Sequence, residues 1–104
     1  MPKLTKLEKL EEVRKQAFQR GLKIKADPRL TCTPYCAMNE HAAKELKQPY
    51  IKDTLTYSPE TKDVDKIAMD LNHEIHEADR MEQGWKYKAA HKYANRKQRT
   101  FKKD

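Results

Sequence analysis

With 104 residues, of which 38% are charged and 37% hydrophobic, the chain predicts a single domain with a small core. No apolar run approaches the roughly 20 residues that span a bilayer, and the N-terminus lacks the apolar segment of a secretory signal. We therefore expect a cytoplasmic protein, a monomer or a homodimer, without membrane contact.

The net charge of +7 is concentrated at the C-terminal end of the chain. Residues 1–85 contain 15 basic and 15 acidic residues, whereas residues 86–104 contain eight basic residues and one acidic residue. This asymmetry predicts a compact helical domain over residues 1–87 and a basic C-terminal extension over residues 88–104.

The first predicted element is an amphipathic helix over residues 6–20. Thr5 and Glu8 have capping-box spacing, and Gly21 is a stop signal. The helix has one apolar stripe, expected to face the core, formed by Leu7, Leu10, Val13, Ala17 and Phe18. Residues 22–26 alternate between apolar and basic side chains and predict a short strand.

A second helix is predicted over residues 34–47, where Thr33 and Pro34 supply an N-cap and a first helical residue. Cys32 and Cys36 are expected to be partly buried free thiols of a reducing compartment. The alternative, a metal half-site that His41 completes, lacks the usual two-residue spacer. Residues 48–57 are expected to form a loop or short extended structure.

The longest helix is predicted to begin near Ser58-Pro59-Glu60 and to end before Gly84. Its buried face is an apolar series of Val64, Ile67, Ala68, Leu71, Ile75, Ala78 and Met81. Gly84 suits the left-handed position after the helix, so Trp85 can fold back on the last turn. A further helix is expected from Tyr87 to about Arg96, with fraying beyond.

The fold class is therefore mainly α, a small single domain of three to four helices. Residues 22–26 and 50–57 are candidates for a short strand or β-ribbon beside these helices.

The segment from Asn72 to Tyr87 resembles the core of the ryanodine receptor repeat domain. That core reads approximately His-x-x-Trp followed by Arg-x-x-x-Gly-Trp-x-Tyr-Gly, and the residues of this chain that match it are His73, Arg80, Gly84, Trp85 and Tyr87. His76 and Lys88 stand where the pattern has its first Trp and last Gly. The resemblance implies a non-catalytic binding module, since the family has no shared catalytic residues.

The candidate ligand-binding residues are Arg80, Trp85 and Tyr87, together with His73 and His76. A guanidinium beside aromatic rings can bind an anion and stack on a planar group, which favours a nucleotide-like ligand or a partner protein. The competing interpretation is structural, with Trp85 packed on the helix and Arg80 paired with Glu77 or Asp79.

A cluster of His73, Glu77 and His91 offers metal-ligand chemistry, but a hydrogen-bonded structural role for His73 is the preferred interpretation. We expect no metal and no cofactor. No catalytic motif is found, so no enzyme activity is expected. The acidic residues of the long helix are assigned to its solvated face, namely Asp63, Asp65, Asp70, Glu74 and Glu77.

The alternative function is nucleic-acid binding through the basic extension, by Lys86, Lys88, Lys92, Arg96, Lys97 and Arg99. Tyr93 and Phe101 are interleaved with these residues as stacking surfaces. A solvated end and a segment that orders on an acidic partner protein are the other interpretations.

Overall fold

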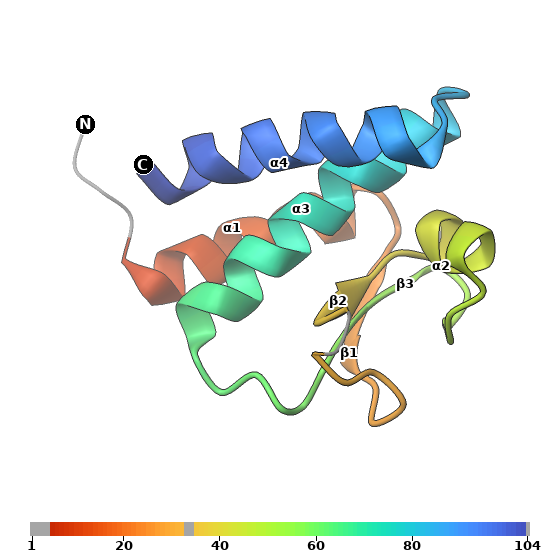
Figure 1. Cartoon of the computed structure of the whole chain (residues 1–104). Coiled ribbons are helices and arrows are strands. Elements are labelled where there is room, and N and C mark those ends of the chain that lie inside the picture. Colours follow the sequence, from red (N-terminus) through yellow and green to blue (C-terminus); the bar gives the residue numbers. More distant parts are fainter. Residues whose placement is uncertain (1–4, 33–34, 104) are drawn as a thin grey trace.

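A computed structural model describes residues 5–32 and 35–103. In these ranges the chain forms four helices and a small three-stranded sheet (Figure 1). The helices are α1 (Lys6–Gln19), α2 (Glu40–Leu46), α3 (Val64–Glu82) and α4 (Tyr87–Lys103), and the strands are β1 (Lys23–Ala26), β2 (Ala37–Met38) and β3 (Thr54–Tyr57). The predicted mainly α class and small single domain are confirmed.

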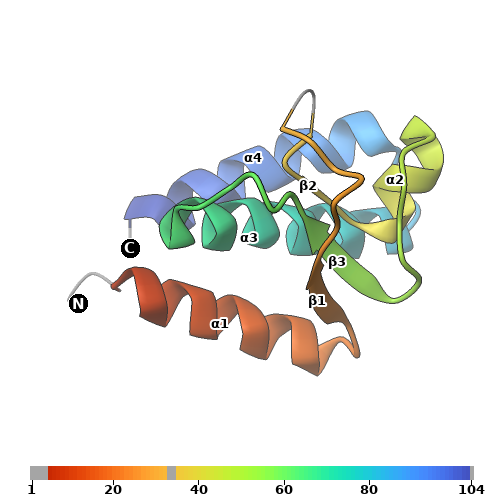
Figure 2. The same ribbon diagram turned by 90° about the horizontal axis from the view of Figure 1, so that it is seen from below.

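Helix α3 lies between α1 and α4, while the sheet packs beside its C-terminal half (Figure 2). In the sheet, β3 is central and pairs in parallel with β1 and antiparallel with β2. The main core fills the space between α1, β3 and α3 and contains Val13, Ala17, Leu55, Ala68, Leu71 and Ile75. None of the helices in the described ranges combines the length and apolar character that a membrane crossing requires.

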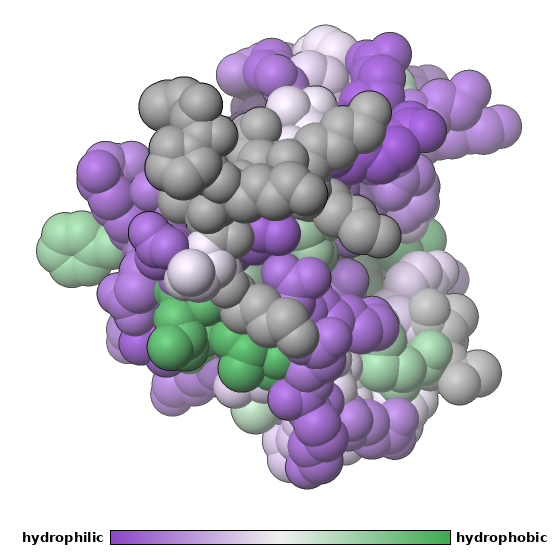
Figure 3. Space-filling model, turned by 90° about the vertical axis from the view of Figure 1, so that its left-hand side faces the viewer, coloured by the Kyte–Doolittle hydropathy of each residue, from purple (hydrophilic) through white to green (hydrophobic). Residues whose placement is uncertain are grey.

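Helix α1 begins as predicted, because Thr5 and Glu8 form both hydrogen bonds of a capping box. Its apolar stripe is only partly in the core. Val13 and Ala17 are buried, but Leu7 and Phe18 are 68% and 84% exposed, against the expectation for both. Leu10, Val13 and Ala17 share the helical face that turns toward the core, whereas Leu7 and Phe18 lie beside that face and stay outside the core. The face where α1 begins and α4 ends is mostly hydrophilic with small hydrophobic areas (Figure 3).

The second predicted helix is wrong in its first part. Residues 37–38 form strand β2 on β3, and α2 begins only at Glu40, after Asn39 as its N-cap. The predicted N-cap and N1 pair, Thr33 and Pro34, lies outside the described residues. Pairing with β3 satisfies backbone groups at 37–38 that a helix would otherwise have satisfied.

The expectation of free thiols is also wrong, because Cys32 and Cys36 form a disulfide. Their Cα atoms are 4.1 Å apart. The sulfur atoms are therefore not available as a metal half-site.

The two C-terminal helices also differ from expectation at their ends. Helix α3 begins at Val64, with Asp63 as N-cap, rather than near Ser58. Helix α4 continues to Lys103 instead of fraying after Arg96. Phe101, near its end, packs against the main core, which gives the last turns a hydrophobic anchor.

Candidate functional site

Helices α3 and α4 form an antiparallel hairpin that positions the candidate residues. Gly84 has φ 96°, and the amides of Gly84 and Trp85 donate to the carbonyls of Met81 and Arg80, both at 3.0 Å. These two bonds define a Schellman motif, as the sequence predicts for Gly84. Ala90 and Ala94 of α4 are fully buried, so small side chains allow α4 to approach α3 closely.

At the turn of this hairpin, Arg80 stacks against two aromatic rings. Its guanidinium carbon lies 4.2 Å from the ring centre of Tyr93 and 5.5 Å from that of Trp85. Nη2 of Arg80 donates to the Tyr93 hydroxyl at 2.8 Å, and Nη1 donates to Gln83 Oε1 at 2.9 Å. Trp85, which is 40% exposed, meets Tyr93 edge to face at 5.8 Å. Arg80 is thus held in place by planar and polar contacts.

Two more cations surround the same tyrosine. The guanidinium of Arg96 and the ammonium of Lys97 lie 5.9 and 5.6 Å from the Tyr93 ring centre. Arg80, Trp85, Tyr93, Arg96 and Lys97 are called the cationic–aromatic cluster below. In residues 5–32 and 35–103 none of its three cations forms an ion pair, so their charge is not neutralised locally.

The carboxylates expected to neutralise Arg80 are engaged elsewhere. Asp79 binds Arg20 of α1 through a forked pair whose shortest contact, Nη2 to Oδ2, is 2.7 Å. Glu77 contacts two histidines, His73 and His91, instead of Arg80. The predicted pairing of Arg80 with Glu77 or Asp79 is therefore wrong.

His76 adds a neutral ring to this surface. It meets Tyr93 edge to face at 6.2 Å. Burial lowers the pKa of the His76 imidazole, and the positive charges of Arg20, Lys97 and Arg80 act in the same direction against Asp79. His76 is consequently uncharged at neutral pH, and the positive charge comes from arginine and lysine alone.

Tyr87 and His73 do not join this surface. The Tyr87 ring stacks on His91 at 5.3 Å and packs against a second apolar cluster of Leu30, Met38, Ala42 and Ala43. Burial, reinforced by the charge of Glu77, raises the pKa of Tyr87 to about 12, so its hydroxyl stays protonated. The structure thus divides the five predicted ligand-binding residues, placing Arg80, Trp85 and His76 together and Tyr87 and His73 elsewhere.

His73 belongs to a buried polar cluster between α3, α4 and the start of α2. Its members are Asn39, His73, Glu74, Glu77, His91 and Gln98. Nε2 of His73 lies 3.0 Å from Glu77 Oε2, and His91 Nδ1 lies 2.8 Å from the same oxygen. The two ring nitrogens are 3.2 Å apart.

Asn39 connects α2 to this cluster. Its Oδ1 accepts from the amide of Ala42 as the N-cap, while Nδ2 donates to Glu74 Oε1 at 3.0 Å and to Glu77 Oε1 at 3.1 Å. Burial, and then the neighbouring charge of Glu77, raises the pKa of Glu74 well above its ordinary value. Glu74 and Glu77 are 6% and 1% exposed, so their assignment to the solvated face of α3 is wrong.

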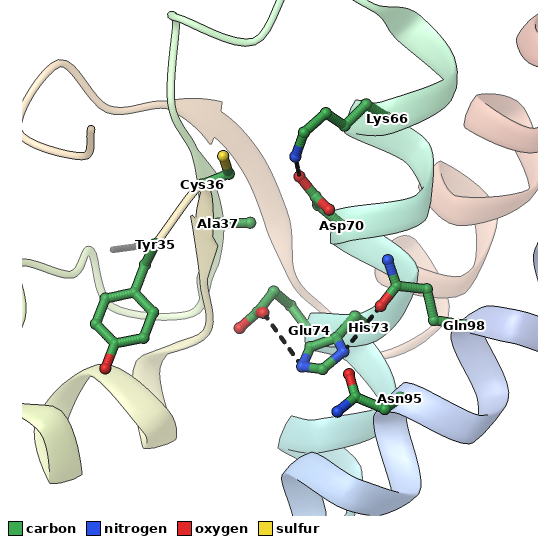
Figure 4. A pocket seen from close by; sticks show the side chains of 9 residues that line it. All are labelled: Tyr35, Cys36, Ala37, Lys66, Asp70, His73, Glu74, Asn95 and Gln98. Atoms are coloured by element: carbon green, nitrogen blue, oxygen red, sulfur yellow. Dashed lines mark hydrogen bonds and ion pairs between the residues drawn. The ribbon is translucent and has the colours of Figure 1, made fainter. Parts of the chain in front are cut away.

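Beside the polar cluster lies a pocket of about 250 Å³ between β2, α3 and α4 (Figure 4). His73 and Glu74 form its inner wall, and Tyr35, Asp70 and Gln98 lie around it. An ion pair of 2.9 Å joins Lys66 to Asp70 at its edge. The polar cluster is therefore close to a pocket even though most of its atoms are buried.

The basic residues of the alternative site lie along α4 and the turn before it. All of Lys86, Lys88, Lys92, Arg96, Lys97 and Arg99 are exposed. Arg96 and Lys97 belong both to this basic surface and to the cationic–aromatic cluster. The two candidate surfaces are consequently continuous.

The sequence predicts Tyr93 as a stacking residue of the basic extension and groups His91 with His73 and Glu77 as possible metal ligands, but it does not single out Asn39 or Gln98. Tyr93 and His91 are 13 and 14 residues from Arg80 and Glu77, and Asn39 is 38 residues from Glu77. A helical spacing of three or four links residues of one helix only, so no local pattern indicates these contacts. The available signal is the pair of helices on either side of Gly84, because an antiparallel hairpin brings positions such as 77 and 91 together.

Comparisons with protein-family models, with curated proteins and with solved structures found no match. The function must therefore be argued from the chemistry of the two clusters.

Proposed function

We propose that the protein is a non-catalytic binding module, similar to a ryanodine receptor repeat, that holds an anionic ligand on the cationic–aromatic cluster. The observation that carries the proposal is the gathering around the Tyr93 ring of three cations that form no ion pair with the described part of the chain. Concentrating like charges costs free energy that an anionic group on the ligand would recover.

The aromatic part of the cluster supports a ligand with a planar ring. Trp85 is 40% exposed and lies beside the guanidinium of Arg80, whose orientation is fixed by its hydrogen bond to Tyr93. An exposed indole of this kind can stack on a base, while Arg96 and Lys97 contact a phosphate or carboxylate. A nucleotide-like ligand, or an acidic segment of a partner protein, matches this combination.

The second candidate is a nucleic acid bound along α4. The observation that favours it is the continuity of the cationic–aromatic cluster with the exposed Lys88, Lys92 and Arg99 of the same helix. A single strand would place bases on Trp85 and phosphates along the helix, with strong salt dependence.

The test uses substitutions rather than truncation, because α4 packs along α3 and contributes Phe101 to the core. The double variant Arg96→Gln/Lys97→Gln removes two exposed cations of the cluster. Arg14→Gln/Lys15→Gln is its matched control, since this pair is also adjacent, exposed and helical, on α1. Trp85 fluorescence is followed while nucleotides, a single-stranded oligonucleotide and an acidic peptide are titrated.

We expect the Arg96/Lys97 variant to weaken binding about fivefold or more, with the control within about twofold, since exposed charge contacts contribute up to about 1 kcal/mol each. For a single strand, the plot of the logarithm of the binding constant against the logarithm of the salt concentration should become shallower. The magnitude of its slope should decrease by about 1.4, the effect of two lost phosphate contacts. A saturable response to a nucleotide at moderate salt supports the first candidate, and binding restricted to the polymer supports the second. Equal behaviour of the two double variants would contradict both.

A further inference from the structure

We propose that His73, Glu77 and His91 form a binding site for a divalent transition-metal ion of the zinc type. The three atoms His73 Nε2, Glu77 Oε2 and His91 Nδ1 form a triangle with sides of 3.0, 2.8 and 3.2 Å. Two imidazole nitrogens and one carboxylate oxygen are the ligands such an ion prefers.

The size of the triangle agrees with metal coordination. Zinc binds histidine nitrogen at about 2.0–2.1 Å and carboxylate oxygen at about 2.0–2.2 Å, so the ligand atoms of a tetrahedral site lie about 3.3 Å apart. The three observed sides are shorter than this value by at most half an ångström, so a small outward movement of the side chains is sufficient. The backbone positions need not change.

The hydrogen bond at the other side of His73 orients its free electron pair toward the triangle. Nδ1 of His73 lies 3.1 Å from Gln98 Oε1, a carbonyl oxygen that can only accept, so Nδ1 carries the proton. In the tautomer that carries its proton on Nδ1, the electron pair of Nε2 is at the triangle. A metal-bound histidine usually donates its second nitrogen in this way, to an oxygen that fixes the ring.

Glu77 and His91 are held in a comparable manner. The second carboxylate oxygen of Glu77 accepts from Asn39 Nδ2 at 3.1 Å, which leaves Oε2 for the triangle. The ring of His91 stacks on Tyr87 at 5.3 Å. All three ligands therefore come from packed helices and have supporting contacts of their own, as a preorganised metal site requires.

The electron pair of His73 Nε2 and the buried carboxylate oxygen of Glu77 repel each other. A positively charged group between the two atoms would remove this repulsion. The Glu77 side chain is 2% exposed, and a buried carboxylate is stable only when it is paired or bound to a metal. A proton shared with the histidines is the competing occupant. Solvent reaches this side of the triangle, because the His91 side chain is 41% exposed.

The experiment is calorimetric titration of Zn²⁺ into the full chain, oxidised at the disulfide and freed of any affinity tag. The variant is His91→Ala, and His41→Ala is the matched control. His41 has the same side-chain exposure of 41% and also contacts a glutamate, Glu82 at 3.2 Å, but it lies outside the triangle. Mg²⁺ is titrated in parallel as a cation that prefers oxygen ligands.

We expect one Zn²⁺ per chain, no comparable Mg²⁺ binding, and an affinity at least about tenfold weaker in His91→Ala, because even loss of a supporting contact costs 10–100-fold. His41→Ala should bind as the unaltered protein does, and Gln98→Ala should bind about tenfold more weakly. Circular dichroism establishes that each variant is folded.

A second measurement on the unaltered protein does not depend on any variant. Co²⁺ should give the visible absorption of a low-symmetry, four-coordinate site, and Zn²⁺ should abolish it at one equivalent. Absence of both the calorimetric heat and the Co²⁺ spectrum would overturn the proposal and assign the triangle to protons. Equal Zn²⁺ affinity of His91→Ala and His41→Ala would overturn it as well.

Discussion

Replacing Asn39 with alanine is expected to lower the free energy of unfolding by about 3 kcal/mol. The substitution removes the N-cap of α2, which alone contributes about 1 kcal/mol. It also removes the only amide that donates to both Glu74 and Glu77 in the described residues. Two buried carboxyl groups then each lose a hydrogen bond worth about 1 kcal/mol.

Urea unfolding followed by circular dichroism measures this effect. Asn95→Ala is the matched control, because Asn95 is exposed on α4, and its effect should stay within about 0.5 kcal/mol. Asn39→Asp separates the two roles of the side chain, since aspartate keeps the N-cap oxygen but cannot donate to carboxylates. If Asn39→Asp were as stable as the unaltered protein at neutral pH, the carboxylate contacts would contribute nothing and the argument would fail.

Replacing Leu71 with alanine is expected to cost about 3 kcal/mol of unfolding free energy, within the range found for fully buried leucines. Leu71 is 0% exposed and lies in the main core with Val13, Leu55 and Ile75. The substitution leaves a cavity, and a small core has few neighbouring side chains that could move to fill it. The melting temperature should fall by about 15 °C, given a shift of roughly 4–8 °C per kcal/mol for a domain near this size.

The same substitution at Leu7 is the control. Leu7 is 68% exposed on α1, so Leu7→Ala should change stability by less than about 0.5 kcal/mol. Differential scanning calorimetry compares the two variants. Similar melting temperatures for both would show that the core does not lie between α1, β3 and α3.

The elements that the sequence predicted well are those with local causes. Thr5 and Glu8 are three residues apart and cap α1 in whatever way the rest of the chain folds. Gly21 and Gly84 have φ of 70° and 96°, and each ends its helix through bonds to the preceding turn. Leu71 and Ile75 repeat at helical spacing, so the buried face of α3 was also readable.

The errors concern segments whose structure depends on a distant neighbour. Residues 37–38 are extended because β3 supplies their hydrogen-bond partners. The alanine-containing segment that follows them favours a helix. Glu74 and Glu77 look like solvated residues of α3 until Asn39 and two histidines provide partners in the interior. Leu7 and Phe18 look like core residues, but both are exposed because they lie beside the buried face of α1 and not on it.

The candidate sites divide in the same way. Arg80 and Trp85 could be predicted from the sequence to lie close together, because a single Schellman turn at the end of α3 joins them. Tertiary packing places Tyr93 between three cations, and it brings to one point His73, Glu77 and His91, which the sequence grouped only by residue type. The physical reason is that backbone geometry fixes contacts within a turn of helix, whereas contacts between α3 and α4 depend on how two apolar faces pack.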